Sequence, residues 1–350
     1  MKATYCKYIL DFKSPGTTSR GVLTQKETWF LLLDNGSDYG IGECALFRGL
    51  SVDDVPEYEE KLKWTCTNIN LGETRLLAGL RAFPSIQFGL EQAFKSLDSE
   101  DPFVLFASDF TDREAPIEIN GLIWMGSEEY MQQQIDQKLS AGFTCLKMKI
   151  GAIEFEKEIA LLHSIRKQYS KDDITIRVDA NGAFSLEDAK EKLKILSAYD
   201  LHSIEQPIGQ GNVLKMKQLC EETALPIALD EELIGIFDVT EKEELLQMIR
   251  PQYIILKPSL IGGYAGCKEW IQLASGFGIG WWITSALESN IGLNAIAQWT
   301  YTLENRLPQG LGTGGLFTNN IGCPLKVEEG RLYYKSKTNW DTRQIRELCL

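Results

Sequence analysis

The sequence predicts an α/β protein in which a (β/α) TIM-type barrel follows a smaller N-terminal α+β domain. From residue 117 onwards, short apolar strands alternate with amphipathic helices. The spacing of about 25 to 30 residues is typical of parallel βαβ units. Seven or eight such units in succession favour a closed barrel over an open doubly wound sheet. No G-x-G-x-x-G motif follows the first strand of this region, which further disfavours a dinucleotide-binding sheet.

The first part of the chain has a different pattern. Residues 2–12 and 22–33 read as two strands joined by a Gly/Pro/Ser-rich loop, and a third strand follows the turn at 34–38. Helical periodicity occupies residues 54–66 and 84–97. We therefore expect an α+β domain over residues 1–112.

The predicted barrel spans residues 113–317. Its helices include two segments with charged first turns, at 154–169 and 185–199. A final segment, 318–350, contains a strand-turn-strand pattern and is expected to return to the first domain. The strands of the barrel are predicted at 117–126, 144–151, 174–184, 203–208, 225–233, 252–263, 280–290 and, with a much weaker pattern, 308–317.

Composition excludes several classes of function. The chain has 350 residues, 44% of them hydrophobic and 24% charged, as in globular proteins. A net charge of -13 argues against nucleic acid or an anionic membrane as a partner. No apolar run approaches the ~20 residues of a membrane helix, and no secretory signal is recognised, so a cytoplasmic location is expected. The sequence makes no prediction of oligomeric state.

The sequence also limits the catalytic chemistry. Only two histidines occur, His163 in a helical pattern and His202 just before a strand, and both are interpreted as structural. Ser-His and Cys-His mechanisms are therefore disfavoured. Acid-base chemistry in this chain must use Lys, Asp or Glu.

Two lysines stand one residue apart in the apolar strand "TCLKMKIG". Because side chains alternate along a strand, Lys147 and Lys149 share one face, while Leu146, Met148 and Ile150 share the other. The apolar face is expected to pack on the helices. The lysines then point into the barrel, near the carboxyl-terminal mouth where barrel active sites form.

The same alternation places a charged residue at the inward end of each following strand. These residues are Asp179, Glu205, Asp230 and Lys257, and Asn181 follows Asp179 on the same face. Three carboxylates from adjacent strands, with no Cys or His among them, suit a hard cation that prefers oxygen. The pattern predicts Mg²⁺, with Mn²⁺ as a substitute. The alternative is that these charges form only structural ion pairs.

A proton-transfer role is predicted for Lys149. A lysine beside a second ammonium group and a bound dication gives up its proton more readily than an isolated lysine. Lys149 lies nearer the strand's carboxyl end than Lys147, so we interpret Lys149 as a general base. The alternative is that both lysines merely neutralise the acids.

Taken together, these motifs resemble the enolase superfamily, and within it the muconate lactonizing enzyme subgroup. The resemblance covers nearly the whole chain and rests on "KMK", "RVDANGAF", "IEQP", "LDEE", "LKPSLIGG" and "SALESNIG" in this order and spacing. It implies a capping domain before the barrel and a small-molecule carboxylate as substrate. Loops of that domain, around Arg20 and at 43–49, are expected to close over the substrate.

The resemblance also implies roles for individual residues. Asp179, Glu205 and Asp230 would bind Mg²⁺, and Lys149 and Lys257 would face each other across the substrate. Lys147 would assist Lys149. A base would remove the proton α to the substrate carboxylate, giving an enediolate that the metal stabilises.

Within the subgroup, "PSIQFGLEQA" and "INGLIWMG" resemble the o-succinylbenzoate synthase family of menaquinone biosynthesis. This implies dehydration of 2-succinyl-6-hydroxy-2,4-cyclohexadiene-1-carboxylate to o-succinylbenzoate, a hydro-lyase reaction. Candidate substrate-binding residues are Arg20, Asn181 and Ser285.

Two other readings stay open. One is an N-acylamino acid racemase or dipeptide epimerase, although "GLGTGGLFTNN" lacks the acidic D-x-D element by which dipeptide epimerases of the subgroup hold an ammonium group. The other is a non-catalytic relative that uses the fold as a binding module.

Overall fold

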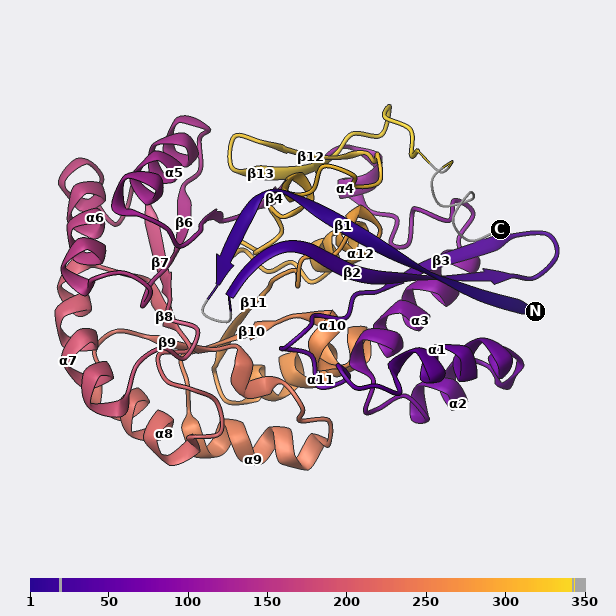
Figure 1. The fold of residues 1–350 in the computed structure, drawn as a ribbon, viewed down its shortest axis with the longest axis horizontal. Helices are drawn as coiled ribbons and strands as arrows, with labels where there is room; N and C mark the ends of the chain where they lie inside the picture. The colour runs from indigo at the N-terminus through magenta and orange to yellow at the C-terminus, as the bar shows by residue number, and fades with distance from the viewer. Residues whose placement is uncertain (19–20, 342, 344–350) are drawn as a thin grey trace.

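The computed structural model describes residues 1–18, 21–341 and 343, and contains a sheet-and-helix unit beside a curled parallel sheet surrounded by helices (Figure 1). The first unit has a three-stranded antiparallel sheet in the order β1-β2-β3. Its elements are β1 (Lys2–Thr18), β2 (Gly21–Asp34), β3 (Tyr39–Cys44), α1 (Tyr58–Thr67), η1 (Ile69–Leu71), α2 (Glu73–Ala78), α3 (Pro84–Leu97) and α4 (Asp109–Asp112).

The hairpin of β1 and β2 is longer than predicted. The loop expected at 13–21 is mostly strand, because β1 continues to Thr18 and β2 begins at Gly21. The pairing register shifts between Asp11 and Gly16, and this irregularity accommodates Pro15, which has no N–H to donate. The far end of the hairpin reaches towards the barrel, where a Cβ on Gly16 would lie 3.2 Å from the ring of Trp124.

The helices of the first unit agree with the periodicity in part. The helix predicted at 84–97 is confirmed as α3, and the one predicted at 54–66 begins later, at Tyr58. Helix α2 was not predicted, because six residues provide less than two turns of apolar periodicity.

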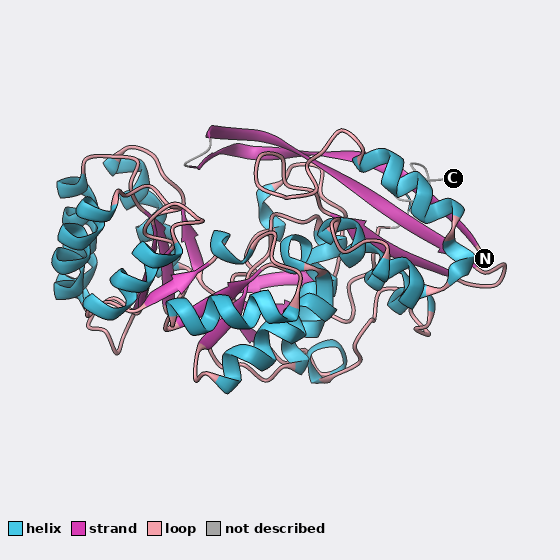
Figure 2. Cartoon of the chain, turned by 90° about the horizontal axis from the view of Figure 1, so that it is seen from below, coloured by secondary structure: helices cyan, strands magenta, loops and turns pink. Residues whose placement is uncertain are grey.

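The second unit is a curled seven-stranded sheet in the order β11-β10-β9-β8-β7-β6-β5, with every neighbouring pair parallel. Helices cover its outer face (Figure 2). Its strands are β5 (Gly121–Ile123), β6 (Cys145–Lys149), β7 (Thr175–Asp179), β8 (Ser203–Glu205), β9 (Ile227–Leu229), β10 (Tyr253–Leu256) and β11 (Gly280–Ile283). Its helices are α5 (Glu128–Ser140), α6 (Phe155–Gln168), α7 (Leu186–Leu196), α8 (Val213–Glu222), α9 (Val239–Ile249), α10 (Pro258–Ile261), α11 (Gly263–Gly276) and α12 (Asn290–Thr302), with 3₁₀ turns η2 (Ser197–Tyr199), η3 (Glu231–Leu233) and η4 (Gly314–Leu316).

The predicted eighth strand is a short bridge. Gln309 and Gly310 form isolated parallel bridges to Ile119 and Thr284, next to the two edge strands of the sheet. The backbone N–H of Gly310 donates to Ile283 at 2.8 Å, and that of Asn120 donates to Gln309 at 2.9 Å. Glycines favour such a short connection over a long ladder. The segment at Gln309 and Gly310 therefore joins the two edges of the curled sheet.

The alternation predicted for the barrel strands is confirmed. Leu146, Met148, Ile176 and Val178 belong to one buried apolar cluster with residues of the surrounding helices. The polar residues between them face the other way, towards the interior. Helix starts follow local chemistry as well, since Ser185 accepts a hydrogen bond from the N–H of Asp188 at the start of α7.

The end of the described chain contacts both units. β12 (Leu325–Glu328) pairs with β13 (Arg331–Tyr334), which pairs with β4 (Ile117–Glu118) before the barrel. Trp340 stacks on Phe103 with ring centroids 4.4 Å apart.

The division of the chain at residues 112 and 317 stays a prediction. None of the helices in the described ranges is long and apolar enough to span a membrane, and the cytoplasmic location stays a prediction from the sequence.

Two carboxylates of the first unit dock on the first turns of barrel helices. Glu43 of β3 accepts hydrogen bonds from the N–H groups of Ser289 and Gly292, both at 2.8 Å, at the start of α12. Glu91 of α3 accepts from the N–H groups of Tyr264 and Ala265, at 2.6 and 3.1 Å, in the first turn of α11. Each carboxyl group accepts from two backbone N–H groups that have no partner within the first turn of the helix, so these contacts hold the two units together.

Glycine makes both docking contacts sterically feasible. A Cβ on Gly263 would overlap the carboxylate of Glu91, and a Cβ on Gly292 would lie 2.8 Å from Oε2 of Glu43. The glycines in "LIGG" and "SNIG" therefore let each carboxylate approach the backbone closely.

Glu91 should make folding stability depend on pH. Burial raises the pKa of Glu91 to about 8, although the two backbone N–H donors oppose this. The unfolded carboxyl ionises near its usual pKa, so between pH 5 and 8 the unfolded state binds fewer protons, and this contribution to stability is lost as the pH rises. We expect Glu91→Gln to abolish that loss. The unfolding free energy of Glu91→Gln minus that of wild type should therefore increase by roughly 2–4 kcal/mol as the pH rises from 5 to 8.

Urea unfolding at several pH values measures this difference. Glu60→Gln, at an exposed position on α1, is the matched control and should leave the pH profile of the wild type unchanged. A constant offset between Glu91→Gln and wild type across the pH range would contradict the prediction.

Candidate active site

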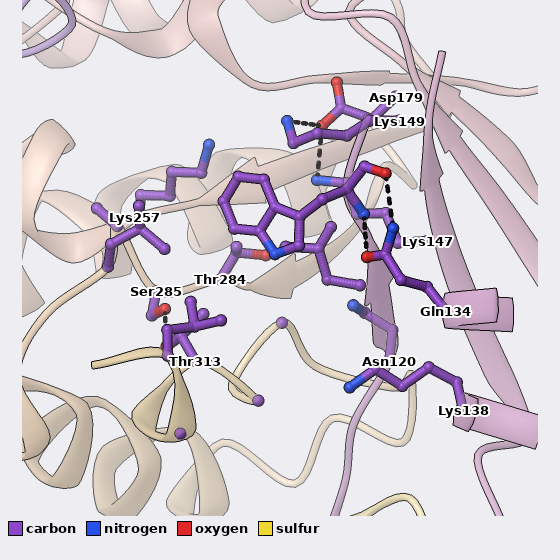
Figure 3. A pocket seen from close by; sticks show the side chains of 18 of the residues that line it. Asn120, Gln134, Lys138, Lys147, Lys149, Asp179, Lys257, Thr284, Ser285 and Thr313 are labelled. Carbon is purple, nitrogen blue, oxygen red and sulfur yellow. Dashed lines mark hydrogen bonds and ion pairs between the residues drawn. The ribbon is translucent and has the colours of Figure 1, made fainter. Parts of the chain in front are cut away.

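A cavity of about 470 Å³ opens where the barrel strands end (Figure 3). Part of its polar lining comes from residues at the ends of β6, β7, β10 and β11. Phe47 and Leu50 of the first unit, together with Leu287 and Leu316, supply apolar lining. Because the apolar side chains exclude water from part of the cavity, charges inside it interact more strongly than they would in solvent.

The two lysines of β6 share one carboxylate, as the strand alternation predicts. Nζ of Lys147 lies 3.0 Å from Oδ2 of Asp179 and also contacts Glu205. Nζ of Lys149 lies 3.2 Å from the same Oδ2 and donates to Oδ1 of Asn181 at 2.5 Å. The side chain of Lys149 is 11% exposed and that of Lys147 is 7% exposed, so both ammonium groups are nearly removed from bulk water.

Lys257 approaches the cavity from the opposite side (Figure 3). It directly follows β10, and three strands separate β10 from β6 in the sheet. Its ammonium group contacts Asp230, at the end of β9. A planar carbon centre held between Lys149 and Lys257 would therefore have an ammonium or amine on each face.

The electrostatics of the site follow from burial and close charges. Burial favours the neutral form of Lys147, but the carboxylates of Asp179 and Glu205 outweigh it and raise the pKa of Lys147. Likewise, burial disfavours ionised Asp179, but Lys147 and Lys149 hold its pKa below the usual range. Burial, with the charge of Asp179, raises the pKa of Glu205 well above its usual value. Glu205 is therefore the carboxylate whose negative charge is least compensated.

The predicted metal ligands lie at the ends of three consecutive strands. Asp179, Glu205 and Asp230 are each at most 2% exposed. Each contacts a lysine, and the described residues include no three His, Cys, Asp or Glu side chains already gathered around one point, so a cation would bind here only if the ammonium groups gave up part of these contacts. The two carboxylate oxygens of Glu205 are buried and make no hydrogen bond. Oε2 of Glu205 does contact the ammonium group of Lys147, but Oε1 has no such contact in the described part of the chain, and a buried carboxylate with a free oxygen beside two other acids fits a hard divalent cation.

The predicted substrate anchors have different outcomes. Asn181 lines the cavity, and its Nδ2 donates to Oε1 of Glu231 at 3.1 Å. Ser285 also lines it, and its hydroxyl is 2.6 Å from that of Thr313. Arg20 lies outside the described residues. The binding roles of all three stay predictions.

Several lining residues were not singled out from the sequence. Glu231 and Thr313 are neighbours of predicted positions, and the second acid of "LDEE" was a usable signal for Glu231. Asn120 and Lys138 had no such signal, because Asn120 precedes β5 and Lys138 lies on helix α5. Arg177 of β7 has its Cζ 3.8 Å from the centre of the Trp282 ring, and its Nη1 donates to the carbonyl of Pro308 at 2.8 Å.

Residues 130–337 match a family model described as Enolase C-terminal domain-like. The chain is 47% identical to an o-succinylbenzoate synthase from Desulfotalea psychrophila, over 95% of this chain and 98% of that protein. The crystal structure of MenC from Desulfotalea psychrophila LSv54 superposes with a TM-score of 0.85 and 44% identity, covering 95% of this chain and 99% of that one.

More distant relatives include epimerases. An L-Ala-D/L-Glu epimerase from Francisella tularensis subsp. novicida is 28% identical over 62% of each chain. The structure of a dipeptide epimerase from Enterococcus faecalis, complexed with Mg and the dipeptide L-Leu-L-Tyr, superposes with a TM-score of 0.80 and 19% identity, covering 95% and 96% of the two chains. At that identity the likeness concerns the fold.

Proposed function

Because the chain belongs to the Enolase C-terminal domain-like family, we propose that it removes water from 2-succinyl-6-hydroxy-2,4-cyclohexadiene-1-carboxylate to form o-succinylbenzoate, a step of menaquinone biosynthesis. The observation that carries this proposal is the 47% identity to an o-succinylbenzoate synthase over nearly the full length of both chains. The epimerase relatives match at lower identity. The lysines at the cavity supply acid-base chemistry suited to the reaction.

Asp179, Glu205 and Asp230 would hold Mg²⁺, for which Mn²⁺ is a substitute. When bound, the cation supplies positive charge that stabilises the negative charge developing on the substrate carboxylate. It would also relieve the uncompensated charge of Glu205. Lys147, which contacts two of the three acids, would help to fix their positions.

Lys149 acts as the base in this proposal. Its neutral amine takes the proton from the carbon α to the carboxylate, and the electron pair of the broken C–H bond passes into an enediolate. As the enediolate collapses, the C–O bond to the hydroxyl group breaks and Lys149 returns the proton, so that water leaves. Lys257, on the opposite face, stays protonated and stabilises the enediolate by its charge.

An ultraviolet assay tests the proposed function. We expect purified protein with Mg²⁺ to convert the cyclohexadiene substrate to o-succinylbenzoate with a kcat of at least ~1 s⁻¹, within the usual range for enzymes. Removal of the metal with a chelator should abolish turnover, and added Mg²⁺ should restore it. A protein that binds Mg²⁺ but leaves the substrate unchanged would refute the synthase activity.

The placement of Lys149 and Lys257 on opposite sides of the cavity also suits a racemase, which removes a proton on one face and returns it on the other. The lining contributed by residues 310–316 has no carboxylate to hold a substrate ammonium group, so an N-succinylamino acid is a better candidate than a dipeptide. Incubation of N-succinylamino acids in D₂O, followed by mass spectrometry, measures this activity. Exchange of the α-hydrogen without dehydration of the cyclohexadiene would favour the racemase.

A further inference from the structure

A fourth lysine reaches the cavity from outside the barrel. Lys138 lies on helix α5, yet it lines the cavity together with Asn120 (Figure 3). Its aliphatic stem crosses β5 at Gly121, where a Cβ would lie 3.0 Å from Cδ and 3.1 Å from Cγ of Lys138. The glycine therefore leaves the space through which this side chain passes.

Lys138 differs from the other cavity lysines in its lack of a counter-ion. Lys147, Lys149 and Lys257 each contact a carboxylate. Within residues 1–18, 21–341 and 343, Lys138 has no ion pair or hydrogen bond, and its ammonium group lies 4.9 Å from the centre of the Phe143 ring. Burial lowers the pKa of Lys138, and no acid contributes to raise it. A partly buried cation without a carboxylate is a site for an anion.

Asn120 provides a second, independent sign of a ligand. Its side chain is 5% exposed, and its Oδ1 is buried without a hydrogen-bond partner. Buried amides are normally satisfied by protein or ligand groups. Figure 3 shows Asn120 and Lys138 directed into the same part of the cavity. The Nδ2 end of Asn120 faces the cavity in Figure 3, so the two side chains can donate together to one carboxylate.

The pairing register of β5 and β6 gives the position of Asn120 relative to Lys147. Leu122 pairs with Lys147, so Asn120 lies two residues before that level on β5. At the rise of a parallel strand this is about 7 Å along the strand, comparable to the reach of a four-carbon arm. The separation suits a substrate with one carboxylate near Lys147 and another at the end of such an arm.

We propose that Lys138 and Asn120 form a subsite for the distal carboxylate of the succinyl arm, which rests on the proposed function. Lys138 supplies the charge and Asn120 a hydrogen bond, while Gly121 keeps the path of the lysine stem open. The subsite contributes binding energy away from the reacting carbon, so its loss should raise KM more than it lowers kcat.

Binding of the product tests this subsite without turnover. We expect Lys138→Met, which keeps an apolar stem over Gly121, to bind o-succinylbenzoate about 10- to 100-fold more weakly than wild type by calorimetry, as the loss of one charge-assisted hydrogen bond predicts. The analogue whose arm ends in a carboxamide should bind wild type and Lys138→Met equally. Lys138→Arg should recover part of the affinity for o-succinylbenzoate.

Lys61→Met is the matched control. Lys61 is also a half-buried lysine over an aromatic ring, 4.0 Å from the centre of the Trp64 ring, but it lies on α1 away from the cavity. The control should bind product as wild type does. Equal weakening of acid and carboxamide in Lys138→Met, or no weakening of either, would overturn the subsite.

Failure of the proposed function has a different signature. If wild type neither forms nor binds o-succinylbenzoate, the synthase proposal fails. The subsite is then tested by the same titrations with an N-succinylamino acid and with its analogue whose succinyl arm ends in a carboxamide. Tighter binding of the N-succinylamino acid than of the carboxamide by wild type but not by Lys138→Met supports the subsite, and the same preference in both proteins overturns the subsite.

Discussion

Lys149→Ala is expected to lower kcat for dehydration by about 10²- to 10⁴-fold, the usual contribution of a general base. The change removes the amine that takes the α-proton but keeps Asp179, Glu205 and Asp230. Lys147 is a poor substitute, because its ammonium group contacts both Asp179 and Glu205. Initial rates at saturating substrate, with Mg²⁺ affinity measured in parallel, give the result.

Lys190→Ala serves as the control for Lys149→Ala. Lys190 also pairs with a carboxylate, Glu222 at 2.9 Å, but it lies on α7 outside the cavity. Its replacement should leave kcat within about twofold of wild type, as is usual for surface substitutions. Near-normal dehydration by Lys149→Ala would remove Lys149 from the role of base.

Glu205→Gln is expected to weaken Mg²⁺ binding by at least about 100-fold, with a comparable loss of activity at limiting metal. In other enzymes, substitution of a residue that hydrogen-bonds to a metal ligand lowers metal affinity about 10- to 100-fold. Removal of a ligand itself should lower it at least as much. Gln keeps the size of the side chain but offers one neutral oxygen. Calorimetric titration with Mg²⁺ and the metal dependence of kcat measure the two effects.

The matched control for Glu205→Gln is Glu222→Gln, the same substitution at an exposed partner of Lys190. It should bind Mg²⁺ and turn over substrate as wild type does. Unchanged Mg²⁺ affinity in Glu205→Gln would show that the metal is held without Glu205 and would require another ligand set.

Strand alternation was sufficient to predict the charged cluster, because the period of two fixes which residues share a face once the apolar face is known. The period of two therefore places Lys147, Lys149 and Asp179 on the same inward face. The length of the β1–β2 hairpin was not predicted, because Pro15 and its polar neighbours indicate a loop unless a strand irregularity accommodates the proline.

Residues that reach the cavity from outside the strands were also missed. The contribution of Lys138 depends on a helix side chain crossing a strand at Gly121, and sequence periodicity assigns such a lysine to a solvated helix face. Likewise, "PQGLGTGGLF" gave a weak strand pattern, and Gln309 and Gly310 form only isolated bridges. Both cases depend on tertiary placement, which local patterns do not encode.

The docking of Glu43 and Glu91 on the starts of α12 and α11 has a consequence for how substrates enter. Because two buried carboxylates tether the first unit to the barrel, swinging the whole unit aside would break several hydrogen bonds at once. The hairpin adds contacts of its own, because the N–H of Asp11 donates to Oδ1 of Asn319 and its carbonyl accepts from the N–H of Thr318, both at 2.8 Å. Exchange of substrate and product should therefore proceed with the first unit kept in place on the barrel.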